Sequence, residues 1–315
     1  MQTDKALPVA AATVVAVVFG FSFIFTKGAL AYLAPFQLLV LRFALAAFFL
    51  TLLAACRIIK LNLRTEKLPA LLKIALWQPV LYFLFETYGI KLTSASESGV
   101  VIALVPLAIT LLSVIMLGER ITAAQGACAG AAVAGVIVMA LAGPAADGND
   151  PGGHLLGILM LFGAVVAGGL YNIFSRRAAA NFTPMEITFI MMWLGALVFN
   201  AIGLAQGLAA GDFSGYTAHL GQLPVAFGLL YLGLLSSVGA FFLLNYALSR
   251  MPASRTAVFL NLIPLVSLLA GVVFYRERLG PWQLAGCTLI LLGVWGVNYF
   301  AGRTLRIGEA GQVSP

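Results

Sequence analysis

The chain has 315 residues, of which 62% are hydrophobic and 9% are charged, whereas a typical soluble domain has roughly 45–50% apolar and about 25% charged residues. This composition excludes a soluble globular protein and leaves no room for a separate soluble catalytic domain. The formal net charge of +7 does not indicate a nucleic-acid partner, because the basic residues of membrane proteins collect in cytoplasmic loops. The predicted partner is the lipid bilayer, and no nucleic acid is predicted.

Apolar runs bounded by charges or turn residues predict ten membrane-spanning helices. A helix needs about 20 apolar residues to cross the hydrocarbon core of a bilayer, and no run alternates with the period of two that a barrel strand shows. The predicted fold is an all-α integral membrane protein. In chain order the spans are 8–29, 36–56, 69–90, 96–117, 123–143, 155–175, 185–207, 223–247, 256–275 and 281–301.

The basic residues are distributed unequally between the two sides of such a chain. With the N-terminus in the cytoplasm, thirteen of the eighteen Lys and Arg residues fall in cytoplasmic segments and Arg42 lies inside a span; the outer side holds four, Lys27, Lys91, Arg276 and Arg278. Because positive charge collects on the cytoplasmic side, the sequence predicts a multi-pass protein of the cytoplasmic (inner) membrane with both termini in the cytoplasm.

Cysteine and histidine are few and scattered. The three cysteines lie in apolar runs, and the two histidines, His154 and His219, fall in predicted loops. Metal sites need several such ligands together, and covalent catalysis needs a nucleophile beside a base. The sequence therefore predicts no metal, no cofactor and no enzyme activity.

An internal repeat divides the chain. Shifting the sequence by 158 residues aligns Pro106 with Pro264 and Glu119-Arg120 with Glu277-Arg278, with 15 identities in 49 positions from residue 88 to residue 136. A shift of 149 pairs segments of the first two spans with the sixth and seventh. Each half then holds five spans, an odd number, so the halves have opposite orientations around a central cavity, as in many secondary transporters. The predicted divisions are residues 1–147, residues 148–303 and a disordered cytoplasmic tail, 304–315.

Pro106 and Pro264 fall near the middles of the fourth and ninth spans. A proline removes one helical hydrogen bond and clashes with the preceding turn. The two residues are therefore candidate hinges, and tolerated packing kinks are the alternative.

Several segments resemble a known family. FGFSFIFTKGAL and APFQLLVLRFALAA look like its first two helices, and TSASESGVVIALVPLAITLLSVIMLGERIT looks like its fourth, with a second copy in MPASRTAVFLNLIPLVSLLAGVVFYRERLG. On these segments the chain resembles the drug/metabolite transporter superfamily, and within it the ten-helix EamA-type permeases. The resemblance implies a basket of helices around a cavity lined mainly by spans 1, 3, 4, 6, 8 and 9. One departure is Phe19, where many relatives have Trp before the Gly.

Glu86 is the leading candidate for a functional charge. An ionisable group inside a bilayer costs roughly 2.5–3.5 kcal/mol on insertion scales, so it needs a partner, a cavity or a role. Gln78, Tyr82 and Glu86 recur every four residues, which places them on one helical face. We predict that this face lines the cavity and that Glu86 couples transport to protons or binds a cationic substrate. The alternative is a structural carboxylate paired with Lys91 or with a hydroxyl of the fourth span.

The other charged residues near the spans are assigned structural or gate roles. Glu97 is expected to cap the outer start of the fourth span, where it can be solvated, and Arg42 is expected to extend outward along its aliphatic stem. The two Glu-Arg pairs are expected to be solvated clasps or gate braces of little energetic weight. The full set is Lys27, Arg42, Glu97, Glu119, Arg120, Glu277 and Arg278.

Amides beside aromatic rings supply a second group of candidates for substrate contact. An amide at membrane depth must find a partner in the protein or in a substrate, and aromatic faces attract cations. These candidates are Tyr171, Asn172, Asn245, Tyr246 and Asn261.

Together these features predict a secondary transporter, classed as a permease or exporter, that moves a small organic metabolite by alternating access. The predicted substrate is an amino acid or an amphipathic or cationic drug-like compound, with proton coupling through Glu86 as an option. The alternatives are a uniporter or channel-like pathway and, less favoured, a membrane enzyme that handles lipids. A monomer is the default, and a dimer is the alternative.

Overall fold

The computed structural model describes residues 3–62, 68–117, 122–142, 151–277 and 279–311, and every regular element among them is helical. The two elements labelled η are π-helical. In chain order the elements are α1 (Thr3–Leu30), α2 (Pro35–Ala55), α3 (Leu68–Ala75), η2 (Leu76–Leu81), α4 (Tyr82–Leu92), α5 (Ala95–Ile102), α6 (Val105–Leu117), α7 (Ala123–Ala142), α8 (Pro151–Ala178), α9 (Pro184–Ala210), α10 (Ser214–Thr217), α11 (Leu223–Leu230), η3 (Tyr231–Ala240), α12 (Phe241–Arg250), α13 (Ala253–Leu260), α14 (Leu262–Tyr275) and α15 (Pro281–Gly311).

Eight helices in the described part of the chain are long and apolar enough to cross a membrane. Of the two remaining predicted spans, 281–301 falls on a shorter apolar helix, Pro281–Val297. The other, 69–90, falls on α3, η2 and α4, where Gln78 has non-helical backbone angles (φ −145°, ψ 117°) just before Pro79. The chain is therefore a multi-pass helical membrane protein. The full count of ten spans stays a prediction.

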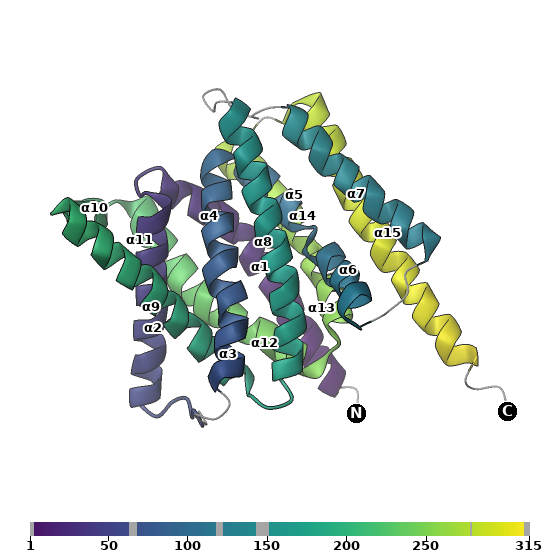
Figure 1. The fold of residues 1–315 in the computed structure, drawn as a ribbon, viewed down its shortest axis with the longest axis horizontal. Coiled ribbons are helices and arrows are strands. Elements are labelled where there is room, and N and C mark those ends of the chain that lie inside the picture. The colour runs from purple at the N-terminus through teal and green to yellow at the C-terminus, as the bar shows by residue number, and fades with distance from the viewer. Residues whose placement is uncertain (1–2, 63–67, 118–121, 143–150, 278, 312–315) are drawn as a thin grey trace.

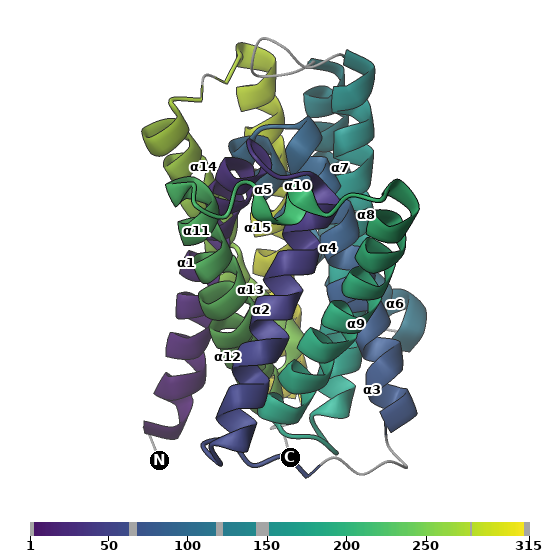
Figure 2. The ribbon, with the colours of Figure 1, turned by 90° about the vertical axis from the view of Figure 1, so that its left-hand side faces the viewer.

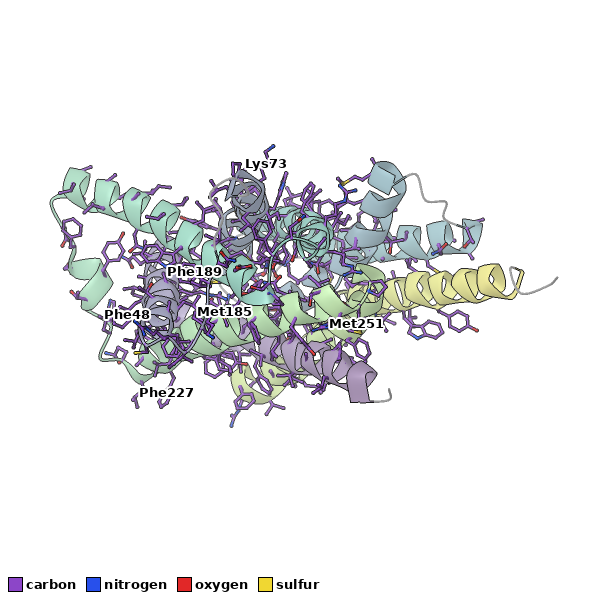
Figure 3. All side chains as sticks on the ribbon, turned by 90° about the horizontal axis from the view of Figure 1, so that it is seen from below. Phe48, Lys73, Met185, Phe189, Phe227 and Met251 are labelled. Atoms are coloured by element: carbon purple, nitrogen blue, oxygen red, sulfur yellow. The ribbon has the colours of Figure 1, made fainter. Side chains whose placement is uncertain are left out.

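The long helices run side by side in one bundle, and the start of α1 and the end of α15 lie at the same end of it (Figures 1 and 2). The buried core is apolar and continuous, and large apolar side chains also cover the outside. Phe48 and Phe227, which lie at the rim in Figure 3, are 67% and 60% exposed. A soluble monomer rarely exposes apolar surface on this scale, so this surface fits a lipid environment.

Helices α7 and α15 pack together at one side of the bundle (Figure 1). Glycine allows the close approach: a Cβ added at Gly293 would lie 2.6 Å from the Cys128 carbonyl oxygen and 2.7 Å from the Ala132 nitrogen. These small residues therefore pack within one chain. Gly126, near the start of α7, faces open space.

Replacing Gly293 with alanine is expected to loosen this pair of helices. The added methyl group would meet backbone atoms, which cannot rotate away, and overpacking of this kind costs about 1–3 kcal/mol. We expect a fall in the thermal unfolding midpoint on the order of 5 °C in detergent. Gly126→Ala is the control and should not lower the midpoint, because nothing lies within 4 Å of the added atom and alanine is the better helix former. Equal midpoints for the two variants would contradict the close packing at Gly293.

Each mid-span proline coincides with a break in its helix. α5 ends at Ile102, four residues before Pro106, and α13 ends at Leu260, four residues before Pro264. A proline ring clashes with the carbonyl of the residue four positions earlier, which accounts for both positions. The breaks are structural facts, and the hinge role stays a prediction.

Near the C-terminus, α15 continues through residues 304–311, where the sequence predicts a disordered tail. This segment contains no proline and includes the good helix formers Arg306, Glu309 and Ala310, which is compatible with a helix that continues past the apolar span.

Candidate functional site

A central cavity lies between the helices and is the candidate site. It has two adjoining parts of about 30 and 40 Å³, which is small beside the roughly 300–1,000 Å³ of typical ligand pockets. The side chains therefore nearly fill these two parts. The first part is lined by Phe19, Ser22, Phe23, Arg42, Gln78, Tyr82, Phe83, Glu86, Ile102, Ser236, Phe241 and Ile263. The second part shares five of these and adds Val105, Pro106, Gly168, Asn172, Leu244 and Leu260.

Gln78, Tyr82 and Glu86 all line this cavity, from η2 and α4. The Tyr82 hydroxyl donates a hydrogen bond of 2.9 Å to Oε1 of Glu86, whose side chain is only 5% exposed. Among the described side chains, neither proposed structural partner contacts Glu86. Lys91 instead donates to the Leu30 carbonyl at 2.7 Å. The carboxylate therefore faces the cavity together with a phenol and an amide.

Arg42 lies at the same cavity, and the expectation that it extends outward is wrong. Its side chain is 2% exposed. Nε donates to the Ser237 hydroxyl at 2.8 Å and Nη2 to the Ser236 hydroxyl at 3.2 Å, and the guanidinium carbon lies 4.2 Å from the centre of the Phe83 ring. Hydroxyls, an aromatic face and the cavity together stabilise the cation inside the bundle, so the side chain does not need to reach water.

The cavity thus contains a cation and an anion that are not paired with each other. Among the described residues, no Arg42 nitrogen lies within 4.0 Å of a Glu86 oxygen. Buried charges are costly unless they are paired and hydrogen-bonded. The arrangement can therefore receive a small polar molecule between two opposite charges.

Among the amide candidates, Tyr171 and Asn245 form a closed polar cluster. The carbonyl oxygen of Asn245 accepts from the Tyr171 hydroxyl at 2.6 Å and from Ser175 at 2.8 Å, and its amide nitrogen donates to Thr188 at 3.0 Å. Both candidate side chains are fully buried, and neither lines the cavity. The structure gives the pair protein partners, and these hydrogen bonds join α8, α9 and α12.

The other three candidates are placed differently. Asn172 lines the second part of the cavity; its amide nitrogen donates to the Gly168 carbonyl at 2.8 Å, and its buried oxygen has no partner among the described residues. Asn261 lies at the break between α13 and α14, and within the same described ranges its buried oxygen also has no partner. Tyr246 is half-buried, with the Arg250 guanidinium 5.9 Å from its ring centre.

Charged side chains close one end of the bundle, which we call the Lys27 end. Nζ of Lys27, in α1, donates to the Ile90 carbonyl at 2.9 Å and also to the Thr93 carbonyl, so it binds the last carbonyls of α4. Glu277, just beyond α14, accepts from the backbone nitrogens of Ala95 and Ser96, each at 2.9 Å, at the start of α5. Cations at helix C-termini and anions at helix N-termini are favourable, so both contacts stabilise this closure.

Glu97 is buried at the same end. It belongs to the predicted cap, a capping box with Ser94, but it is fully buried, and the expectation that it can be solvated is wrong. Its Oε1 lies 3.2 Å from Nε2 of His154 and accepts from Gln283 at 3.3 Å. These contacts join α5, α8 and α15. His154 is not in a loop as predicted, because α8 already begins at Pro151, a residue suited to the first position of a helix.

Sequence reasoning missed the partners of these charges. Ser236 and Ser237 are neutral residues in an apolar run, and only their adjacency in a predicted span could have signalled a polar position. The 158-residue shift aligns Gln283 with Gln125, but this alignment does not indicate a contact with Glu97. Glu119, Arg120 and Arg278 lie outside the described residues.

Comparison with known proteins gives consistent matches along the chain. The EamA-like transporter family matches it twice, over residues 7–141 and 155–299. A protein named as an uncharacterized transporter of Bacillus subtilis is 33% identical and aligns over 91% of each chain. A probable amino-acid metabolite efflux pump of Escherichia coli is 26% identical over 96% of this chain and 97% of its own. A probable terminal-alkyne amino-acid exporter of Streptantibioticus cattleyicolor is 28% identical over 65% of this chain and 64% of its own.

The fold is also similar to that of a protein of known crystal structure. The two chains are 23% identical, with a TM-score of 0.57 over 91% of this chain and 97% of the other. At this level of identity the match supports the fold alone.

Proposed function

Since the chain belongs to the EamA-like transporter family, we propose that it is a secondary transporter that moves a small organic metabolite across the cytoplasmic membrane by alternating access. The observation that carries this proposal is the central cavity, which holds the buried charged residues Arg42 and Glu86 inside a largely apolar bundle. Charged groups at membrane depth are expensive and typically mark a substrate or ion pathway.

An inverted repeat of two five-span halves is part of this proposal, and recurring helix boundaries support it. α5 and α13 begin at residues 95 and 253, and α7 and α15 begin at 123 and 281, so both pairs differ by 158. The same shift moves η2, at residues 76–81, to 234–239, which falls inside η3. The family also matches two separate segments. Exchange of the two conformations of such halves gives alternating access.

We place the Lys27 end on the outer side of the membrane. The termini lie at the opposite end (Figures 1 and 2), and the excess of basic residues in the loops on the terminal side favours a cytoplasmic location for it. In this orientation the contacts of Lys27, Glu97 and Glu277 hold the outer gate closed. One chain encloses the cavity, which supports a monomer as the transporting unit.

The proposed substrate is an amino acid or a small amphipathic cation. An amino-acid substrate is favoured by two relatives, a probable amino-acid metabolite efflux pump and a probable amino-acid exporter. Glu86 is proposed as the coupling residue, because a proton and a substrate ammonium group compete for the same carboxylate, and that competition produces exchange.

Counterflow in proteoliposomes tests this function. Vesicles containing the purified protein and an unlabelled solute are diluted into the labelled solute, with amino acids, quaternary amines and nucleosides as the panel. We expect saturable uptake, stimulated by solute inside, for the amino-acid or the cationic class. Flux that neither saturates nor responds to internal solute would favour a channel, and no flux for any class would contradict the proposal.

A further inference from the structure

The cavity presents two opposite charges at one small site. Arg42 comes from α2 and Glu86 from α4, both line the same part of the cavity, and both are almost fully buried. Each nitrogen of the Arg42 guanidinium lies more than 4.0 Å from both carboxylate oxygens of Glu86, and both residues are among those described. A ligand that carries both charges could therefore bridge them without breaking an existing ion pair.

The guanidinium of Arg42 has N–H groups that make no hydrogen bond to the described residues. Its hydrogen bonds to Ser237 and Ser236 use Nε and one N–H of Nη2, and Nη1 makes no hydrogen bond within the described part of the chain. The ring of Phe83 lies against the guanidinium and fixes its plane. A planar guanidinium with free N–H groups matches the geometry of a carboxylate. Arg42 thus has the properties of a carboxylate-binding residue rather than of a packing residue.

The Glu86 carboxylate also uses only part of its hydrogen-bonding capacity within the described protein. The Tyr82 hydroxyl donates to Oε1, and Oε2 accepts no hydrogen bond from the residues described here. A carboxylate with an oxygen facing the cavity can accept from an ammonium group, which has three N–H donors and no acceptor. The cavity therefore offers one recognition group for each end of a zwitterion.

We infer that the substrate is a zwitterionic α-amino acid with an apolar side chain, whose carboxylate binds Arg42 and whose ammonium group binds Glu86. This inference rests on the proposed transport function and narrows its substrate class. The remaining lining of this part is mostly apolar, with Phe19, Phe23, Phe241 and Ile263 beside the polar Ser22 and Gln78, so it favours an apolar side chain. The cavity is nearly filled in this conformation, so binding of an amino acid requires the surrounding helices to move apart.

A matched ligand series tests the inference on the wild-type protein. Phenylalanine, phenylalaninamide and N-acetylphenylalanine share one side chain, but the amide lacks the carboxylate and the acetyl derivative lacks the ammonium group. Each compound competes against labelled phenylalanine in counterflow, and each is also tested for its effect on the thermal unfolding midpoint. We expect phenylalanine to inhibit at a concentration at least tenfold below the other two and to give the largest stabilisation.

Variants of Arg42 assign the carboxylate contact. In Arg42→Gln the inhibitory concentration of phenylalanine is expected to rise at least tenfold while that of phenylalaninamide stays the same, so the preference disappears. Arg42→Lys keeps the positive charge but lacks the planar arrangement of N–H donors, so it should retain part of the preference for phenylalanine over phenylalaninamide. Arg57→Gln, at an exposed position outside the cavity, is the control and should behave like wild type.

The outcomes separate this inference from the transport function. Equal inhibition by phenylalanine and its amide in wild type, or an unchanged preference in Arg42→Gln, would overturn the role of Arg42 while exchange itself persisted. Exchange of quaternary amines without exchange of any amino acid would contradict a zwitterionic substrate. It would still support the proposed transport function. No exchange of any compound would overturn the transport proposal itself. If Arg42→Gln does not fold, the wild-type ligand series still decides.

Discussion

Glu86→Gln is expected to abolish accumulation of substrate against a pH gradient while exchange of substrate persists. Glutamine fills nearly the same volume and can still accept the hydrogen bond that Tyr82 donates to Oε1, but it cannot bind and release a proton. Loss of the negative charge also weakens the contact with a substrate ammonium group. We therefore expect the substrate concentration that gives half-maximal exchange to rise about tenfold. This change corresponds to about 1.4 kcal/mol, close to the contribution of one hydrogen bond to a charged group.

The measurement is uptake into proteoliposomes with an imposed pH gradient, compared with counterflow without one. The wild type should concentrate substrate, whereas the Glu86→Gln protein should only equilibrate it. Glu186→Gln is the matched control, because Glu186 is also 5% exposed but lies outside the cavity, where it accepts from the backbone nitrogens of Thr183 and Asn62. Accumulation by Glu86→Gln at the wild-type level would make Glu86 a structural residue.

The shared face of Tyr82 and Glu86 could be predicted because it depends only on local geometry. A spacing of four residues places side chains on one face of a helix, and a polar face within an apolar span must turn away from lipid. Gln78 also lines the cavity, but its backbone is not helical, so the helical spacing does not account for its position. The same logic located the breaks in α5–α6 and α13–α14, since a proline acts on its own helix four residues earlier. Neither inference requires knowledge of which helices are neighbours.

The role of Arg42 could not be predicted, because its partners are distant in the chain. Ser236 and Ser237 lie 194 and 195 residues away, in the π-helical segment η3. Lipid contact and a cavity are equally compatible with an isolated arginine in an apolar run, and only the packing of α2 against η3 distinguishes them. The partners of Tyr171 and Asn245 could not be predicted for the same reason, since the Tyr171 hydroxyl donates to Asn245 across two helices.

His154 shows a different limit of prediction from the sequence. The stretch around it, DGNDPGGH, is polar and rich in glycine, which is typical of a loop. The helix nevertheless starts at Pro151, and the histidine contacts Glu97, 57 residues earlier in the chain. Composition therefore indicated a polar segment beside the apolar run but not whether a polar side chain in that segment was buried.

Glu277→Ala is expected to open the Lys27 end. The two hydrogen bonds from the backbone of Ala95 and Ser96 to the Glu277 carboxylate join the end of α14 to the start of α5. Hydrogen bonds to a charged group contribute about 1.5–3 kcal/mol, so loss of this contact should shift the equilibrium between closed and open forms at least about tenfold. Ser98, one turn into α5 and fully buried, should then become reachable from outside.

Cysteine labelling in intact cells measures this opening. In a background without Cys56, Cys128 and Cys287, a Ser98→Cys variant reacts with a membrane-impermeant maleimide, and adding Glu277→Ala should raise the rate about tenfold. Asp212→Asn is the control. Ser214 donates a backbone and a side-chain hydrogen bond to Asp212, and these bonds hold the pKa of that carboxyl below its ordinary value, but this turn is exposed and the bonds join no second helix. Because Asp212→Asn weakens a local turn only, its labelling rate should match the background. An unchanged rate in Glu277→Ala, measured well below the unfolding temperature of each variant, would mean that other contacts, such as those of Lys27 and Glu97, are sufficient to keep this end closed.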